Sequence, residues 1–345
     1  MNIPYVMRKC TKCGKWFVAS HYNFYKSKKS KWGLSSRCKE CDKIKSKVFR
    51  DNNKDYIKDY NKNYREIKLE YISNINIRVL RNKTGEIEVM PIDVYLVGVL
   101  AGEMPIYFDM EALKAQAVAS RSYALKRIGY NKDKDYDVED SIMNQVYLDN
   151  EYLKEAWKDK YIKNINKIRK AVNSTLDEYL YYEDTLVDAM FFSTSNGYTE
   201  DPENIFGFSA PYLKSVASPW DEGVSEAFMT SKIMSLRDFY NLLGLEYNKN
   251  LNIEILKRSS SNRILLLKIN GKEFSGNIVK QKLSLRSNDF EITLLGNDIS
   301  ITSKGYGHGV GMSQYGALGM AKEGYKYDEI LKYYYNGSYI KKIKL

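Results

Sequence analysis

The sequence predicts a large α+β body that follows a small N-terminal zinc-binding module. Two observations point to the body: residues 75–89 alternate apolar and polar side chains as strands do, and residues 110–128 carry apolar side chains at helical spacing. A third points to the module, because all the cysteines of the chain fall near its start in two Cys-x-x-Cys pairs. With 345 residues and 43% apolar composition, the chain can bury a substantial core, which excludes a mainly disordered protein.

Four cysteines in two pairs predict a structural zinc site: Cys10, Cys13, Cys38 and Cys41. Four thiolates can surround Zn²⁺ as a tetrahedron, and a segment as short as residues 1–43 cannot bury enough apolar surface to fold otherwise. Two disulfides are the alternative, which the lack of further cysteines and of a visible export signal disfavours. Four thiolates leave no open coordination position, so we expect a structural ion and a surface position for His21.

A small apolar layer is expected beneath the metal. Gly14, directly after the second cysteine, suits the tight turn of a metal knuckle, because glycine adopts positive φ without strain. The side chains expected in the layer are Trp16, Phe17, Phe24, Tyr25, Trp32 and Leu34.

The net charge of +11 is concentrated at the N-terminus. Residues 1–70 carry 19 basic and 7 acidic side chains, whereas residues 71–345 carry 35 and 36. The body is therefore close to neutral, which argues against a protein that binds nucleic acid over its whole surface. The lysines and aromatics of the module could bind a nucleic acid or an anionic wall polymer, or could form a solvated basic surface.

Residues 44–73 are polar and charged, without Pro or Gly, and predict a helical connector. Tyr56, Tyr60 and Tyr64 are four residues apart and would form one stripe on that helix. We therefore divide the chain into a zinc-binding module over residues 1–43, this connector, and a body over residues 74–345.

The first part of the body predicts a β-hairpin and then an alanine-rich helix. The hairpin turns at Asn82 to Gly85, and the helix follows Pro105 with Asp109 as its N-cap. Packing accounts for the alanines but not for Glu103, which lies between an apolar segment and the proline turn. A carboxyl group that enters a partly apolar pocket has the raised pKa of a general acid, although a glutamate before a helix often only interacts with the helix dipole.

The central part of the body predicts helices over residues 153–172, an apolar strand over 186–192 and a β-rich portion over 253–301. A polar turn, Ser193 to Gly197, follows the apolar strand. Its hydroxyl and amide groups suit carbohydrate, since they both donate and accept hydrogen bonds, and they suit a plain polar turn equally well.

A glycine-rich segment, Gly305 to Gly319, contains six of the 21 glycines and precedes a predicted helix over residues 325–335. Such a density implies tight turns or close approach to a ligand. A phosphate-binding loop is disfavoured, because no Gly-Lys-Ser/Thr ends the segment. His308 either satisfies a local backbone bond or helps to position sugar hydroxyls or the carboxylate.

Two long motifs resemble the stage II sporulation protein D family, also called SpoIID/LytB. They are VYLVGVLAGEMPIYFDMEALKAQAVASRSYAL and GYGHGVGMSQYGALGMAKEGYKYDEILKYYY. The segments DAMFFSTSNGYTED, PYLKSVASPWD and LSLRSNDF resemble family segments in the same order, so the likeness covers about residues 75–340. Outside it, CTKCGKWFVASHYNFYKSKKSKWGLSSRCKEC resembles small zinc-ribbon modules found beside nuclease domains in phage and bacterial proteins.

The resemblance implies a lytic transglycosylase that acts on peptidoglycan glycan strands without stem peptides. A hydrolase normally uses two carboxylates, whereas here the C6 hydroxyl of muramic acid is the nucleophile and one carboxylate suffices. Glu103 would protonate the glycosidic oxygen and then accept the hydroxyl proton, which leaves a 1,6-anhydromuramic end and needs no cofactor. Gln116 and Arg121 match the family's AQAVAxR pattern and would support the acid or the substrate, or only buttress the helix. Candidates for the sugar-binding cleft are Ser193, Ser195, His308, Gln314 and Tyr315.

Two other functions fit parts of the sequence. One is a non-catalytic wall-binding protein that enhances a cell-wall amidase, a role attached to part of the family. The other is a nucleic-acid-binding protein in which the zinc module dominates. Some relatives carry histidine and cysteine as metal ligands near the polar turn, where this chain has Phe192 and no cysteine, so we expect no zinc in the body.

The sequence leaves localisation open. No run approaches the roughly 20 apolar residues of a membrane helix, and Met1 to Lys12 lacks the apolar core of a signal peptide. Family members usually carry an export signal or an anchor, and the expected substrate lies outside the cytoplasmic membrane. The resemblance also implies a role in sporulation, at engulfment.

Overall fold

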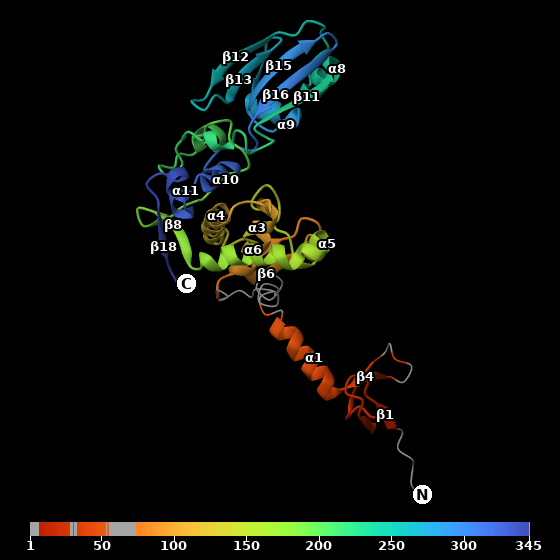
Figure 1. Cartoon of the computed structure of the whole chain (residues 1–345). Coiled ribbons are helices and arrows are strands. Elements are labelled where there is room, and N and C mark those ends of the chain that lie inside the picture. Colours follow the sequence, from red (N-terminus) through yellow and green to blue (C-terminus); the bar gives the residue numbers. More distant parts are fainter. Residues whose placement is uncertain (1–6, 28–29, 31–32, 53, 55–73, 345) are drawn as a thin grey trace. The chain divides into compact units, whose positions relative to one another are not determined.

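The structure is a computed structural model of the whole chain, and it describes residues 7–27, 30, 33–52, 54 and 74–344 (Figure 1). The chain divides into two compact units, Met1–Arg65 and Glu66–Leu345. Helices and strands are mixed along the second unit, which confirms the predicted α+β class. Among the described residues, no helix is long and apolar enough to cross a bilayer.

The described part of the first unit contains two short antiparallel hairpins and a helix. The pairs are β1 (Met7–Lys9) with β2 (Trp16–Val18) and β3 (Phe24–Lys26) with β4 (Leu34–Cys38), and α1 (Lys39–Asn52) follows. The helix expected in the connector therefore begins earlier, inside the module, because the second cysteine pair spans the junction of β4 and α1. Four aromatic residues of the predictions lie outside the described residues: Trp32, Tyr56, Tyr60 and Tyr64.

The apolar layer beneath the cysteines contains fewer aromatic side chains than predicted. Phe24 is fully buried, and Phe17 and Leu34 pack against it. Trp16 and Tyr25 are exposed, because each adjoins an inward-pointing neighbour in its strand and therefore faces solvent. The prediction was wrong for these two side chains, and a core this small depends on a further stabilising centre.

The second unit begins with the predicted hairpin, β5 (Asn76–Leu80) and β6 (Ile87–Pro91). A short strand, β7 (Val138–Glu139), extends the sheet beside β5 in parallel. Of the two hairpin strands, β5 supplies the fully buried side chains, Ile77 and Val79, whereas Ile87 and Val89 on β6 face solvent.

Four helices form the centre of this unit: α3 (Ile92–Glu103), α4 (Met110–Tyr130), α5 (Asn150–Trp157) and α6 (Tyr161–Ser174). α4 begins where predicted, because Asp109 caps it by accepting a hydrogen bond from the Glu111 N–H at 2.9 Å. The alanines of α4 are buried where it packs against α3 and α6. Small side chains allow this close packing of helix backbones.

The strands after α6 join the C-terminal segment to this centre. β8 (Glu178–Tyr182) lies between β9 (Thr185–Leu186) and β18 (Tyr339–Lys342), and β10 (Phe191–Phe192) pairs in parallel with β17 (Met312–Ser313). The strand predicted over residues 186–192 is therefore broken, because Met190 N–H turns back to the Asp188 carbonyl at 2.9 Å. Three helices complete this part: α7 (Pro202–Phe206), α10 (Gln314–Lys322) and α11 (Tyr327–Tyr334).

The β-rich portion has a hydrophobic core of its own. One sheet contains β11 (Met229–Ser235), β16 (Asp298–Lys304) and β15 (Asp289–Leu295), and another contains β12 (Ile253–Arg258), β13 (Ile264–Ile269) and β14 (Lys272–Ser275). Two helices, α8 (Leu236–Leu243) and α9 (Gly276–Lys282), pack with them around that core (Figure 1). The portion therefore starts with β11, earlier in the chain than predicted.

Candidate active site

Glu103 is the last residue of α3, and a closely packed loop brings a backbone donor to it. Neither Gly98 nor Gly102 on this helix has room for a side chain. A Cβ on Gly98 would lie 2.3 Å from the Tyr147 ring, and one on Gly102 would lie 2.9 Å from the Val146 carbonyl oxygen. The loop therefore lies directly against the helix, and the Val146 N–H donates to Glu103 Oε1 at 2.6 Å.

The environment of Glu103 suits a general acid. Burial raises the pKa of its carboxyl group, and this effect exceeds the opposing effect of the hydrogen bonds from Val146 and Gln314. Gln314 Nε2 donates to Glu103 Oε2 at 3.3 Å, so the two sequence motifs meet at this carboxyl group. A raised pKa keeps the proton on the acid at a higher pH than in a free glutamic acid.

Two tyrosines extend the site from Gln314. Their hydroxyl oxygens, on Tyr107 and Tyr315, lie 3.0 Å apart, and the Tyr315 ring meets Phe108 edge to face at 4.9 Å. Burial and the neighbouring Tyr107 hydroxyl raise the pKa of Tyr315 to about 12, so it is a neutral hydrogen-bonding group. Tyr107 is 66% exposed and is not distinguished by the sequence pattern, although it lies in the connection that leaves Glu103.

A buried carboxylate, Asp221, fixes the segment that carries Gln314. It accepts hydrogen bonds from the Ser313 hydroxyl, from the Ser195 N–H at 2.8 Å and from the Ser218 hydroxyl at 2.8 Å. Ser313 in turn is the N-cap of α10, and Gln314 is the first residue of that helix. Asp221 was not predicted, because a single aspartate in a loop has no pattern that reveals its partners.

The two serines predicted to bind sugar differ in accessibility. Ser195 is fully buried, and its hydroxyl lies 2.8 Å from both Asp221 Oδ2 and the Ser218 carbonyl oxygen, so it stabilises the loop and cannot reach a sugar in this structure. Ser193 is partly exposed. Its carbonyl accepts a hydrogen bond from the Tyr315 N–H at 3.0 Å, which joins the polar turn to the glycine-rich segment.

Gln116 and Arg121 are buried on α4. Arg121 Nη1 donates to the Thr175 carbonyl at 2.7 Å, and Arg121 Nε lies 3.8 Å from Asp93 Oδ1. Gln116 Nε2 donates to the Ser120 hydroxyl at 3.0 Å. Neither side chain is accessible to a substrate here, so the structure favours the buttressing alternative for both.

His308 is enclosed by aromatic rings and makes the local backbone bond that was one of its two predicted roles. Its Nδ1 accepts from the Val310 N–H at 3.0 Å, and its ring centroid lies 5.8 Å from that of Phe192 and 5.4 Å from that of Phe206. Burial, with the positive charge of Lys280, lowers the pKa of His308 to about 4. The imidazole is therefore neutral near pH 7.

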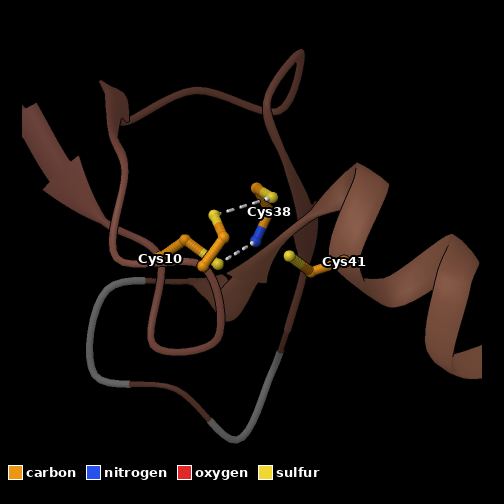
Figure 2. Close-up of side chains that lie close together, drawn as sticks. Cys10, Cys38 and Cys41 are labelled. Carbon is orange, nitrogen blue, oxygen red and sulfur yellow. Dashed lines mark hydrogen bonds between the residues drawn. The ribbon is translucent and has the colours of Figure 1, made fainter.

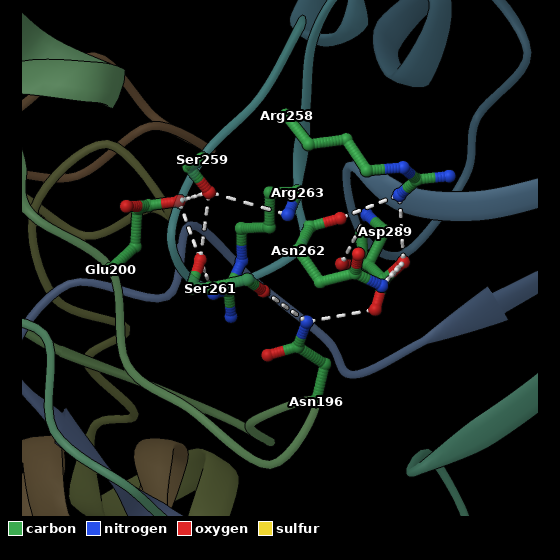
Figure 3. A network of polar contacts seen from close by, with 9 residues as sticks. Asn196, Glu200, Arg258, Ser259, Ser261, Asn262, Arg263 and Asp289 are labelled. Atoms are coloured by element: carbon green, nitrogen blue, oxygen red, sulfur yellow. Dashed lines mark hydrogen bonds and ion pairs between the residues drawn. The ribbon is translucent and has the colours of Figure 1, made fainter. Parts of the chain in front are cut away.

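A polar network whose centre, Glu200, Ser261 and Arg263, is buried adjoins the glycine-rich segment. Figure 3 shows the network. The Glu200 N–H donates to the Gly309 carbonyl at 2.7 Å, and the Glu200 carboxylate accepts from the Ser261 hydroxyl at 2.6 Å. The Arg263 guanidinium lies so close to Gly309 that a Cβ there would be 2.6 Å from it. Positive φ angles account for four of the six glycines of this segment: Gly305, Gly307, Gly309 and Gly311. The other two, Gly316 and Gly319, lie in α10, where a Cβ would be 2.1 Å from the Tyr334 hydroxyl and 2.5 Å from Trp220.

The thiols of the first unit form a compact cluster (Figure 2). One ligand atom from each of Cys10, Cys13, Cys38 and Cys41 lies within 4.8 Å of the others. The Lys12 and Cys38 N–H groups donate to Cys10 Sγ at 3.4 and 3.3 Å. The Cys13–Cys38 sulfur separation of 4.0 Å agrees with a tetrahedral zinc centre, whose sulfurs are about 3.8 Å apart when Zn–S is about 2.3 Å. His21 is exposed, as predicted.

The fold and the site define an α+β protein in which two motifs from opposite ends of the body meet at one desolvated glutamic acid. A model of the SpoIID family, described as Stage II sporulation protein, matches residues 80–182. The chain is 41% identical over 270 residues to Stage II sporulation protein D of Bacillus amyloliquefaciens, with 77% of this chain and 78% of the relative covered.

The same protein of Bacillus subtilis (strain 168) is 41% identical over 273 residues, which are 78% of this chain and 79% of the relative. The Amidase enhancer of Bacillus subtilis is 29% identical over 301 residues, which are 70% of this chain and 40% of that protein. The chain belongs to the stage II sporulation protein D family.

Proposed function

We propose that the protein is a peptidoglycan lytic transglycosylase that cleaves glycan strands without stem peptides, with Glu103 as acid and then base. The observation that carries this proposal is the desolvated carboxyl group of Glu103 between the Val146 N–H and the Gln314 amide. The sporulation names of the relatives support a role in spore formation, and we propose that this role is at engulfment.

The reaction needs one carboxyl group and no added water. Protonated Glu103 gives its proton to the glycosidic oxygen while the bond from that oxygen to C1 of muramic acid breaks. The carboxylate then accepts the proton of the C6 hydroxyl, whose oxygen bonds to C1 and closes the 1,6-anhydro ring. The Val146 N–H donates to Oε1 at 2.6 Å, whereas the Gln314 contact with Oε2 is longer, at 3.3 Å. The longer contact favours Oε2 as the atom that carries the proton.

The acidic residues that follow Glu103 in the chain are engaged in other interactions. Asp109 caps α4. Glu111 Oε1 pairs with Lys114 Nζ at 2.8 Å, and Glu111 Oε2 accepts from the Tyr327 N–H at 3.1 Å. Burial alone would raise the pKa of Glu111, but the contacts with Lys114 and Tyr327 outweigh burial and lower this pKa. Glu111 therefore stays ionised and is unsuited to donate a proton.

Mass spectrometry of purified peptide-free glycan strands tests the proposed reaction. Wild-type protein should create 1,6-anhydromuramic ends and Glu103→Gln should not. Reducing ends would show hydrolysis and a second catalytic carboxylate. If neither protein cleaves and both enhance an amidase equally, the chain is a wall-binding enhancer of that amidase. Salt-sensitive DNA binding by an inactive chain would instead favour a nucleic-acid-binding protein.

We also propose that the four cysteines hold one structural Zn²⁺, which stabilises the fold of the first unit and takes no part in the reaction. The mutual distances of the ligand atoms support this site. Because the apolar core of the unit is small, we expect metal binding to supply much of the free energy that stabilises its fold. Elemental analysis of the purified chain should find one zinc per molecule, and Cys38→Ser should lower that content. Retention of zinc by this variant would show that the metal is bound elsewhere.

A further inference from the structure

A cavity of about 620 Å³ opens beside Asn144 and Phe191, and the reaction described above does not use it. Aromatic and cationic side chains dominate its lining. They include Tyr123, Arg127 and Tyr130 from α4, Lys134 from the turn after it, Phe206 from α7, and His308.

Two chain segments that line the cavity also contribute the hydrogen-bond partners of Glu103. In the loop before α5, Asn144 lines the cavity and donates to the Tyr123 hydroxyl at 3.1 Å. Two residues further along this loop, the Val146 N–H donates to Glu103. From a second segment, Phe191 lines the cavity and pairs with Met312 in the β10–β17 register. Two residues after Met312, Gln314 donates to Glu103. The same two segments therefore contribute to the cavity and to the surroundings of the Glu103 carboxyl group.

The lining combines flat rings with positive charge. Tyr130 and Phe206 are 60% and 47% exposed. Lys126 and Arg127 lie over the Tyr130 ring and Phe208 stacks on Phe206, so a ligand would contact the ring surface that these neighbours leave exposed. The Arg127 guanidinium lies 4.3 Å from the Tyr123 ring centroid, and its Nη2 is 3.0 Å from the Asp188 carboxylate, which balances its charge. Lys134 is exposed and adds a second positive charge.

His308 is neutral and adds no charge to the cavity. The positive charges of Arg127 and Lys134 therefore outnumber the negative charge of Asp188, which pairs with Arg127. Aromatic faces suit the apolar face of a sugar ring, and the cation suits a carboxylate on that ring. An N-acetylglucosamine residue has no carboxylate. An N-acetylmuramic acid residue carries one on its lactyl ether, and it is free when no stem peptide is attached.

We propose that this cavity is a glycan subsite next to the cleavage point, and that it binds a sugar residue bearing a free carboxylate. The inference rests on the proposed function, since the strand cleaved at Glu103 supplies the sugar. The rings of Tyr130 and Phe206 pack against the sugar, and the Lys134 ammonium group forms an ion pair with its carboxylate. Binding in the cavity orients the strand so that the neighbouring glycosidic oxygen reaches Glu103.

Calorimetry on the full chain with Glu103→Gln measures binding without cleavage. The probes are soluble peptide-free glycan oligosaccharides and N-acetylglucosamine oligomers of the same length. Tyr130→Ala should weaken both probes about five- to tenfold. Lys134→Ala should weaken only the carboxylate-bearing probe, up to about fivefold, with a loss that fades at high salt.

Matched controls are Tyr152→Ala and Lys132→Ala, which remove exposed side chains of the same types that do not line the cavity. Binding by the cavity variants equal to that of the controls would overturn the subsite while leaving cleavage by Glu103 intact. Equal loss of both probes with Lys134→Ala would overturn the carboxylate reading. Conversely, a wild-type chain that binds as described but forms no anhydro ends would overturn the transglycosylase and keep the subsite.

Discussion

Replacing Glu103 with glutamine removes the acidic proton while keeping the shape of the side chain. The Val146 N–H, 2.6 Å from Oε1, can donate to the amide oxygen just as it does to the carboxylate. The new NH₂ group then faces Gln314 Nε2, which lies 3.3 Å from Oε2, so the Gln314 amide must turn to present its oxygen. The fold is therefore expected to survive the substitution.

The loss of rate follows from the role of the proton. Removal of one general acid lowers a rate by about 10²–10⁴-fold, which corresponds to about 2.7–5.5 kcal/mol of activation free energy. Glu103→Asp keeps the proton but withdraws it by one carbon–carbon bond, and a misplacement of about 1 Å costs about 10²-fold. The order of activities should therefore be wild type, then Glu103→Asp, then Glu103→Gln.

The same substitution should change how stability depends on pH. Burial raises the folded-state pKa of Glu103 above its unfolded value, so its favourable contribution is complete below the unfolded pKa and is lost as the pH rises through the folded pKa. Glutamine cannot ionise and has no such loss. Glu103→Gln should therefore melt at a higher temperature than wild type at pH 8, with a difference that shrinks below about pH 4.

Two measurements check this reasoning together. The rate at which 1,6-anhydromuramic ends form gives the catalytic loss, and thermal unfolding at pH 3.5 and pH 8 gives the stability difference. Glu103→Asp serves as the control that retains a titratable group. A Glu103→Gln variant as active as wild type would refute the assignment of the acid. A variant that melts below wild type at pH 8 would refute the claim that burial of the carboxyl group dominates its environment.

Three further outcomes are expected. Gly98→Val should lower stability by about 1–3 kcal/mol, visible in thermal unfolding, because its Cβ would overlap Tyr147; Gly129→Val, where nothing lies within 4 Å, is the control for bulk in a helix. Asp221→Ala should cost about 3 kcal/mol or more and reduce cleavage, since it removes the acceptor of several buried donors; unchanged unfolding and activity would contradict its anchoring role. A zinc chelator should make residues 7–52 sensitive to protease while the melting of the body stays constant, and resistance after confirmed metal removal would show that the apolar core suffices.

Local patterns predicted most elements of the body but not their long-range partners. The N-cap at Asp109 and the alternation over residues 75–79 depend on neighbours in sequence, and both match the structure. The strand over residues 186–192 was wrong in its centre, because the turn at Asp188 and Met190 depends on tertiary contacts that include the Tyr335 hydroxyl on the Met190 carbonyl. Hydrophobic runs alone do not report such contacts.

The site was predictable only where a residue type and its position both carried information. Glu103 was suspected from its place before a proline turn, and Gln314 was a candidate through the resemblance. Their hydrogen bond joins residues that no sequence periodicity relates. The roles of Gly98 and Gly102 were invisible, because a glycine in a helix reveals nothing of the loop packed against it. Arg121 remained ambiguous until its burial was known, since the same side chain can brace a helix or bind a ligand.

The pairing of Glu103 with Gln314 also bears on how the protein folds. These residues are 211 positions apart, so their contact closes a very long loop and comes at a large entropic cost before other interactions are in place. During synthesis the ribosome releases the helix that ends at Glu103 long before it releases Gln314. A nascent or truncated chain that lacks the second motif therefore holds its acid without one of its two partners. If Glu103 is the acid as proposed, cleavage would then begin only after the β-rich portion and the second motif have been made.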